Sequence, residues 1–312
     1  MKQELFDGKT LQAALRGAEE CIEKHIDELN MLNVFPVPDG DTGINMFLTL
    51  QSANKAGADI TTSSASTVSA AAARGALLGA CGNSGVILSQ VLRGFAKGME
   101  MKERFSCMNF AEALHMAAEM ARSAVVNPVE GTILTVSREA SEMAMRMANR
   151  GASMRQTMTA VVSQAKKSVQ KTPDLLPQLK EAGVVDAGAK GLFYVFQGMR
   201  DYMWKRVTRD KETAIDVAHL QKAAVVRDYG YDLQFLMRGS ALPLDRIRVK
   251  IEKMGESVLV VGDNQLIRVH IHTAEPDAVL SYARDFGEIT DLVTENLNEQ
   301  VKNFQKKHYK RN

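Results

Sequence analysis

Two aspartates, Asp39 and Asp41, stand one residue apart in the stretch LNVFPVPDGDTGINM, which lies between two apolar helical patterns. On a loop both carboxylates can face one cation, whereas on a helix side chains two positions apart diverge. Mg²⁺ commonly binds one or two carboxylates together with substrate phosphate oxygens. A helix that begins near Thr42 would also offer free backbone N–H groups to an anion. The stretch therefore predicts a metal-bridged phosphate site. The alternative is structural, with Asp41 capping the helix and Asp39 forming a local turn.

Two familiar loop motifs do not fit the spacing around these aspartates. An EF-hand loop that began at Asp39 would need glycine at its sixth position and glutamate at its twelfth, but Ile44 and Leu50 stand there. A Walker P-loop ends in Gly-Lys followed by Ser or Thr, and the nearest stretch, AGAKG at 187–191, lacks the hydroxyl residue.

A second candidate loop is GACGNSGVILSQ, residues 79–90, in which Gly79, Gly82 and Gly85 lie three apart. Asn83 or Ser84 could cap the helix that follows. Such a loop can offer backbone N–H groups and a serine hydroxyl to phosphates. It is not a dinucleotide fingerprint, because an alanine-rich helix rather than a strand precedes it. On its own, the stretch is more typical of an ordinary helix–helix turn.

Two histidines, His270 and His272, alternate on a predicted strand, so both side chains project from one face of a sheet. Such a pair can bind zinc when a third ligand joins it. The alternative is a polar sheet face without a metal.

The elements that position these residues differ between the two halves of the chain. Apolar residues recur at helical spacing through residues 1–205, beginning with Leu11, Leu15 and Ile22. Similar stripes run through residues 43–54, 66–79, 84–98, 109–125, 131–149, 153–170 and 186–204. Seven or eight amphipathic helices without an intervening strand pattern predict an all-α bundle.

The period changes after the charged stretch KRVTRDKET. We predict strands over 231–239, 257–263, 265–273 and 288–295, and helices over 245–255 and 276–287. A turn at Asp263 and Asn264 joins the two middle strands. The order β-α-β-β-α-β is that of the ferredoxin-like fold. The predicted protein is therefore multidomain, α followed by α+β, with domains at 1–205 and 222–312 and a linker over 206–221.

Composition narrows the functional class. A length of 312 residues suits two domains of about 150 residues each, and a net charge of +2 excludes a general attraction to nucleic acid. The three cysteines form no CxxC pair, which favours a reducing cytoplasm. No apolar run approaches the roughly 18 residues of a transmembrane segment. The basic stretch KNFQKKHYKR, residues 302–311, is typical of a solvated tail.

Several stretches together resemble a known family. LNVFPVPDGDTGINM, GNSGVILSQ, NPVEGTILTV (127–136) and VVDAGAKGL (184–192) resemble the nucleotide-binding domain of bacterial fatty acid kinase, which is related to the ADP-binding subunit of dihydroxyacetone kinase. GYDLQF, VLVVGDNQLIRVHIHTAEP and ENLNEQ resemble the middle domain of the same kinase. The resemblance runs in collinear order over nearly the whole chain.

The resemblance implies an antiparallel helical barrel that binds Mg-ATP at one end. Asp39 and Asp41 would be the catalytic Mg²⁺ ligands, with Asn33 as a third candidate. The implied nucleotide contacts are made by Thr42, Asn45, Asn83, Ser84, Gly85, Thr132, Asp186 and Gly188. In the second half, Asp232 stands where the resembling domains carry the cysteine of GYC on a neighbouring strand. An Asp232, His270 and His272 site for Zn²⁺ can still form, although zinc prefers thiolate to carboxylate.

Two departures from the family pattern affect the expected function. Cys81 replaces the arginine of the usual GARGNSG loop, and the chain ends at Asn312, where the family's large subunit continues into a third domain. We expect a kinase that phosphorylates fatty acids presented by a separate fatty-acid-binding protein. Its second domain would serve dimerisation or docking of the carrier. The alternatives are a kinase acting on dihydroxyacetone or another small substrate, and a non-catalytic ATP-binding regulatory subunit.

Overall fold

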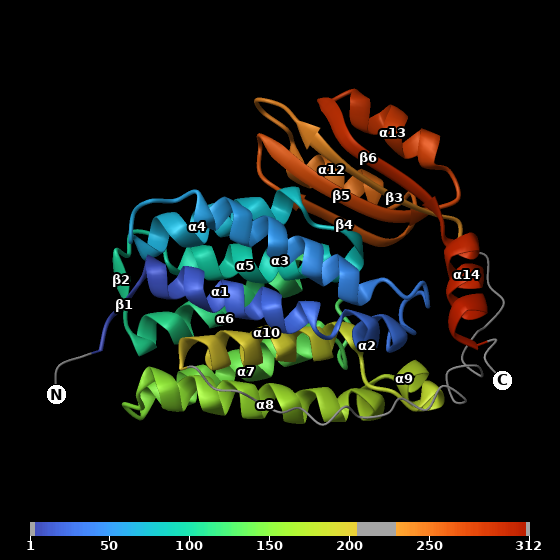
Figure 1. Ribbon diagram of the computed structural model, residues 1–312. Helices are drawn as coiled ribbons and strands as arrows, with labels where there is room; N and C mark the ends of the chain where they lie inside the picture. Colours follow the sequence, from blue (N-terminus) through green and yellow to red (C-terminus); the bar gives the residue numbers. More distant parts are fainter. Residues whose placement is uncertain (1–3, 205–228, 310–312) are drawn as a thin grey trace.

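The computed structural model describes residues 4–204 and 229–309, and the predicted linker over 206–221 lies outside the described residues. We refer to residues 4–204 as the helical part and to residues 229–309 as the sheet part. Figure 1 shows the sheet lying above the bundled helices, toward the right-hand end of α3 and α5.

The helical part confirms the predicted all-α architecture. Its long helices are α1 (Gly8–Glu23), α3 (Thr42–Ala58), α4 (Ala65–Leu78), α5 (Gly82–Gly98), α6 (Cys107–Ala124), α7 (Ile133–Asn149), α8 (Met154–Leu175) and α10 (Ala187–Met203). In this order each helix packs against the next, and α10 packs against α1, which closes the ring. The short helices are α2 (Ile26–Met31) and α9 (Pro177–Ala182), and the two-residue strands β1 (Phe6–Asp7) and β2 (Arg104–Phe105) form an antiparallel pair.

Small residues close the ring between its first and last helices. A Cβ atom at Gly17 would lie 2.5 Å from the carbonyl oxygen of Gly198, so α1 and α10 approach backbone to backbone. The interior is filled by the stripe residues, and Ile22, Met46 and Leu88 have no exposed surface. Burial of these apolar faces is what stabilises the amphipathic helices, since isolated helices of this length are marginal in water.

The sheet part has the predicted ferredoxin-like order. Its elements are β3 (Tyr231–Arg238), α12 (Leu244–Ile251), β4 (Glu256–Gly262), β5 (Leu266–Thr273), α13 (Pro276–Arg284) and β6 (Glu288–Asn296). The four strands are antiparallel and lie in the order β4-β5-β3-β6. Helices α12 and α13 cover one face, where Ile247 and Val279 pack against Phe235 and Ile271.

The opposite face of the sheet packs on the end of the helical ring. Leu236, Leu259, Val261 and Leu266 of the sheet form one apolar cluster with Leu77, Ala80, Val86 and Ala124 of the helical part. Strand β5 is consequently buried along its whole length. The two parts therefore share a core where they meet.

The prediction of a solvated tail over 302–311 is wrong for the described part of that stretch. Residues 297–309 form α14 (Leu297–Tyr309), and Leu297 and Val301 pack against Val37 of the helical part. Phe304 is also buried. The apolar residues recur at helical spacing among the lysines, so the segment is an amphipathic helix with one buried face. Figure 1 shows α14 descending from the end of β6 along the helical part.

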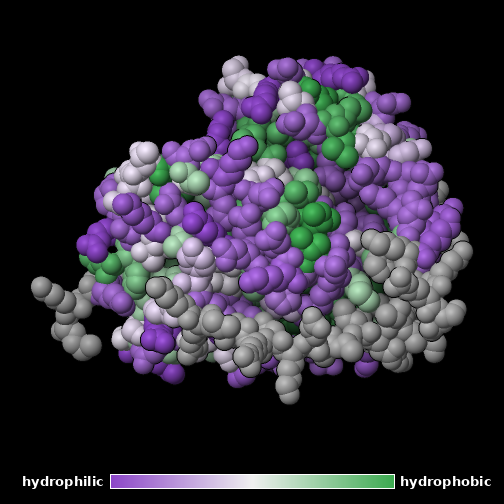
Figure 2. All heavy atoms as spheres, in the orientation of Figure 1, coloured by the Kyte–Doolittle hydropathy of each residue, from purple (hydrophilic) through white to green (hydrophobic). Residues whose placement is uncertain are grey.

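No helix in the described residues is long and apolar enough to cross a membrane. In the view of Figure 2 the surface is mainly hydrophilic, and hydrophobic residues are confined to separate small areas.

Candidate active site

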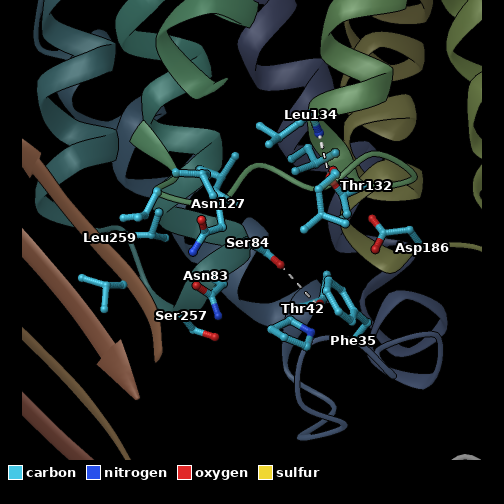
Figure 3. Close-up of a pocket in the computed structure, with 18 residues that line it drawn as sticks. Phe35, Thr42, Asn83, Ser84, Asn127, Thr132, Leu134, Asp186, Ser257 and Leu259 are labelled. Carbon is cyan, nitrogen blue, oxygen red and sulfur yellow. Dashed lines mark hydrogen bonds between the residues drawn. The ribbon is translucent and has the colours of Figure 1, made fainter. Parts of the chain in front are cut away.

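Four helices of the ring begin around one cavity, which we call the main cavity. Thr42 begins α3, Asn83 lies in the first turn of α5, Thr132 precedes α7 and Asp186 precedes α10, and all four line the cavity. Figure 3 shows these residues converging from different helices. Because a helix N-terminus carries a partial positive charge, their convergence favours an anion.

Capping differs between the two ends of the ring. At the far end, the side chains of Asp7, Ser64, Ser106 and Ser153 each accept a hydrogen bond from the helix that they precede. At the main cavity, Thr132 and Asp186 do the same for α7 and α10.

Helices α3 and α5 are the exceptions at the main cavity. Asp41 and Cys81 occupy their N-cap positions and make no side-chain capping bond. The structural alternative for Asp41, that it caps α3, is therefore wrong. The expectation that Asn83 or Ser84 caps α5 is also wrong, because both lie inside its first turn.

The main cavity has a volume of about 240 Å³. One portion of its wall is apolar, with Ile87, Val125, Leu134 and Leu259 among the lining residues. The polar portion contains Thr42 and Ser84, whose hydroxyl oxygens are 3.4 Å apart, together with Asn83 and Asp186. A flat apolar group and a charged group could therefore bind side by side.

The Asp39 and Asp41 turn lies against this polar portion and is built by neighbouring residues. The side-chain oxygen of Asn30 accepts hydrogen bonds from the backbone N–H groups of Gly43 and Ile44, at 2.7 and 3.3 Å. Gly40 has a φ of +76°, and a Cβ atom there would lie 2.0 Å from the ring of Phe304 in α14. Only glycine suits both the left-handed backbone and the close contact.

The two carboxylates have little compensation for their charge. Asn33 Nδ2 donates to Asp39 Oδ1 and, at 3.5 Å, to Asp41 Oδ1. Burial, and then repulsion from Asp41, raises the pKa of Asp39 well above its usual range, and burial also raises the pKa of Asp41. Each residue is partly exposed and lines the carboxylate-facing space beside Asn33. A cation between them would remove the repulsion, so the donor set fits a hard metal ion.

The sheet part brings its own candidate metal ligands to the same place. A second, smaller cavity of about 20 Å³, which we call the carboxylate cavity, is lined by Asp39 and Asp41 from one side and by Asp232, His270 and His272 from the other. Its volume is that of a single water molecule or ion. The two groups were predicted as separate sites in separate domains, and the structure places them around one cavity.

Asp232, His270 and His272 also fit a metal on their own. One ligand atom from each lies within 4.8 Å of the others. Asp232 Oδ1 is 3.1 Å from His270 Nδ1, but not in hydrogen-bond geometry, and within the described residues neither atom has a hydrogen-bond partner. Burial and His270 lower the pKa of His272 to about 3, which leaves it as a neutral ligand. Burial opposes the charge of Asp232, but the neighbouring imidazoles outweigh it and lower the pKa of this carboxyl.

The structure distributes the other predicted contact residues unevenly. Asn83, Ser84, Thr132, Asp186 and Gly188 line the main cavity, and Asn33 lines the carboxylate cavity. Asn45 and Gly85 do not belong to the lining of either cavity among the described residues. A Cβ atom at Gly82 would meet Asn45 Nδ2 and one at Gly85 would meet Thr49 Oγ1, so both positions lie behind the loop and pack it on α3.

Sequence reasoning missed the contribution of β4. Ser257, Val258 and Leu259 line the main cavity beside Asn83. The pairing of β4 with β5 is irregular between Glu256 and Leu259, and Ser257 has a φ of +52°, which is uncommon for a residue other than glycine. No local signal in ESVLVVG indicates a bulge, so only the three-dimensional arrangement reveals it.

Comparison with known proteins identifies the family to which the chain belongs. A family model described as the DAK2 domain matches residues 36–201, and one described as the FakA-like middle domain of fatty acid kinase matches residues 228–304. Protein YloV of Bacillus subtilis is 37% identical over 310 residues, which cover 95% of this chain and 56% of YloV. An uncharacterized protein of Staphylococcus saprophyticus is 34% identical over 317 residues, covering 97% of this chain and 57% of that protein.

The chain thus spans a little over half the length of these relatives. Among solved structures, the dihydroxyacetone kinase of C. freundii aligns with 61% of this chain and 34% of its own, at 19% identity and a TM-score of 0.46. Since the DAK2 match alone covers more than half of the sequence, the chain belongs to the family of kinase subunits that combine a DAK2 domain with a FakA-like middle domain.

Proposed function

We propose that the protein is an ATP-dependent phosphotransferase that phosphorylates the carboxylate of a fatty acid presented by a separate fatty-acid-binding protein. The observation that carries the proposal is the overlap of the two cavities. Thr42, Asn83 and Ser84 line both the main cavity and the carboxylate cavity. A group bound at these three residues would contact a ligand in the main cavity on one side and the carboxylates on the other.

This overlap suggests how a nucleotide would lie. The base would occupy the apolar portion beside Leu134 and Leu259, and the phosphates would extend toward Thr42, Asn83 and Ser84. There the N-terminus of α5, whose N-cap residue Cys81 makes no side-chain capping bond, would face the phosphate charge. Asp186 and Thr132 would border the sugar or the base.

Asp39 and Asp41, with Asn33 beside them, would hold Mg²⁺, which supplies charge neutralisation on the transferring phosphate. In the sheet part, Asp232, His270 and His272 would hold Zn²⁺, for which two imidazoles and one carboxylate are ordinary ligands. In both groups the role of these side chains is to fix cations where phosphate charge develops.

The acceptor chemistry fits the residues present. A fatty carboxylate has a pKa near that of glutamate, about 4.3, and is ionised at neutral pH. Its oxygen attacks the γ-phosphorus, the bond from that phosphorus to the bridging oxygen breaks, and ADP leaves with the bond's electron pair. No proton needs to be removed from the acceptor, so positioning and charge neutralisation suffice. That requirement agrees with a site built from helix N-termini and carboxylates.

The test is transfer of labelled γ-phosphate from Mg-ATP by the full chain to three acceptors in parallel. These are fatty acid bound to a purified fatty-acid-binding protein, dihydroxyacetone, and no acceptor. Mg-ATP binding is measured on the same preparation by calorimetry.

Labelled acyl phosphate in the first arm supports the proposal. Labelled dihydroxyacetone phosphate alone would assign the chain to small-ketone phosphorylation. Binding of Mg-ATP with transfer in neither arm would identify a non-catalytic regulatory subunit, and absence of binding would refute the nucleotide site itself.

A further inference from the structure

The loop before α5 is held by two side chains of the sheet. Gln234 in β3 accepts a hydrogen bond from the backbone N–H of Gly82 through Oε1 at 2.9 Å, and Arg268 in β5 donates to the carbonyl oxygen of Ala80. Both side chains are buried, with 6% and 4% of their residue surface exposed. The sheet therefore binds one backbone N–H and one backbone carbonyl group of the segment 80–82.

Both the oxygen and the nitrogen of the Gln234 side-chain amide form hydrogen bonds. Its Nε2 donates to Asp232 Oδ2 at 2.7 Å, which leaves Oε1 for Gly82. The two partners fix the orientation of the amide, because a flipped amide would place its NH₂ group against a backbone N–H. Gln234 thus connects the Asp232, His270 and His272 group directly to the loop.

Gly82 is the residue at which the loop turns into the helix. Cys81 before it is extended, Gly82 has a φ of +56°, and the N–H groups of Asn83 and Ser84 follow in the first turn of α5. A side chain at Gly82 would collide with Asn45 Nδ2 at 2.2 Å, so the turn is already confined from within. The hydrogen bond from Gly82 to Gln234 confines the turn on its other side. Together the two contacts set the orientation of the first turn of α5, whose Asn83 and Ser84 line the main cavity.

We propose that Gln234 is a positioning residue that sets the affinity of the α5 N-terminus for nucleotide phosphates, so that the sheet part tunes phosphate binding in the helical part. The inference rests on the proposed function insofar as that function places phosphates at Asn83 and Ser84. Gln234 itself lines neither cavity and contacts no substrate.

The experiment compares Gln234→Met with the matched control Gln90→Met in the full chain. Gln90 is an equally buried glutamine of α5 whose Nε2 bonds Ser89 Oγ. Calorimetry measures the Kd of ATP and of adenosine, both with Mg²⁺. Loss of the bond to Gly82 should weaken ATP binding by about five- to twentyfold and leave adenosine binding unchanged, whereas Gln90→Met should change neither.

The comparison of ligands separates positioning from general structural damage. Equal weakening of ATP and adenosine, or unchanged ATP binding, would overturn the proposal. If wild-type protein binds no ATP, the proposed function has failed instead, which the wild-type arm reports independently.

Gln234→Glu provides a second variant of the same shape. It would place a carboxylate oxygen beside Asp232 Oδ2 and should push the side chain off Gly82, with the same selective loss of ATP binding. If neither variant folds, Gln234 is a folding residue and the proposal is wrong.

Discussion

Asp186 is a buried carboxyl of the helical part through which pH should act on stability. It is 6% exposed, and its Oδ1 accepts a hydrogen bond from the N–H of Ala189 at 2.7 Å. Burial raises the pKa of this carboxyl from 3.8 to about 7, although hydrogen bonds from Ala189, Ile133 and Gly188 favour the charged form. The perturbation we consider is Asp186→Asn, which retains an acceptor oxygen and cannot ionise.

The sign of the effect follows from proton binding. Between pH 3.8 and about pH 7 the folded protein holds a proton on Asp186 that the unfolded chain has released. The contribution of Asp186 to the free energy of unfolding therefore falls as the pH rises through this window and is constant above it. Across the whole window the loss is about 4 kcal/mol, at roughly 1.36 kcal/mol per pH unit, and between about pH 5 and pH 8 it is about 3 kcal/mol.

The assay is urea-induced unfolding followed by far-ultraviolet circular dichroism at several pH values from 5 to 8. Relative to wild type, Asp186→Asn should gain about 3 kcal/mol of unfolding free energy over this range. The matched control is Asp7→Asn, at the N-cap of α1. Its bond from Thr10 N–H is the main reason that the pKa of Asp7 lies below 3.8, so its difference from wild type should stay constant over the same range.

A difference between Asp186→Asn and wild type that does not change with pH would refute this reasoning. It would mean that the carboxylate is ionised in the folded protein throughout, and that the N–H groups at the start of α10 outweigh burial.

Asp39→Asn and Asp41→Asn should each reduce Mg-dependent ATP turnover by about a hundredfold or more without loss of circular dichroism at 222 nm, and near-normal turnover at saturating Mg²⁺ would refute the metal assignment. Gly40→Ala should lower stability by about 1–3 kcal/mol more than Gly151→Ala, because both glycines have positive φ but only Gly40 faces Phe304; equal losses in urea unfolding would exclude a role for that contact. After treatment with a chelator to remove bound metal, the protein should take up about one equivalent of Co²⁺ at Asp232, His270 and His272. An unchanged cobalt absorption spectrum in His270→Ala would show that the ion binds elsewhere.

The periodicity of the sequence was sufficient to predict the helices and strands and their order along the chain. The helical stripes correspond to the long helices of the ring, and the period-2 runs after residue 230 correspond to the four strands. Both signals are local, since a residue's spacing to its near neighbours decides which face it shares. For the same reason the DGD turn and the pair His270 and His272 could be recognised from residue types and spacing alone.

The packing of one part on the other could not be predicted in this way. The sequence pattern predicts that Leu236 and Leu259 are buried, but it does not indicate which surface covers them. In the structure they pack against Leu77 and Val86 of the helical part. Asp41 and Asp232 are far apart along the chain, and no local pattern reports their proximity. The basic residues of 302–311 likewise obscured the role of Phe304, which lies on the apolar face of α14.

The closed ring also requires an even number of helices. Neighbouring helices can all be antiparallel around a closed circle only when their number is even, and the N-termini are then divided equally between the two rims. Inserting or deleting one helix would force two neighbours to run parallel, and every helix beyond that point would reverse its polarity with respect to α3 and α5. Only a change by a helical hairpin keeps the N-termini of α3, α5, α7 and α10 on one rim. The gathering of these four N-termini is therefore a property of the whole circle, and insertions in this ring should be tolerated in pairs of helices and not singly.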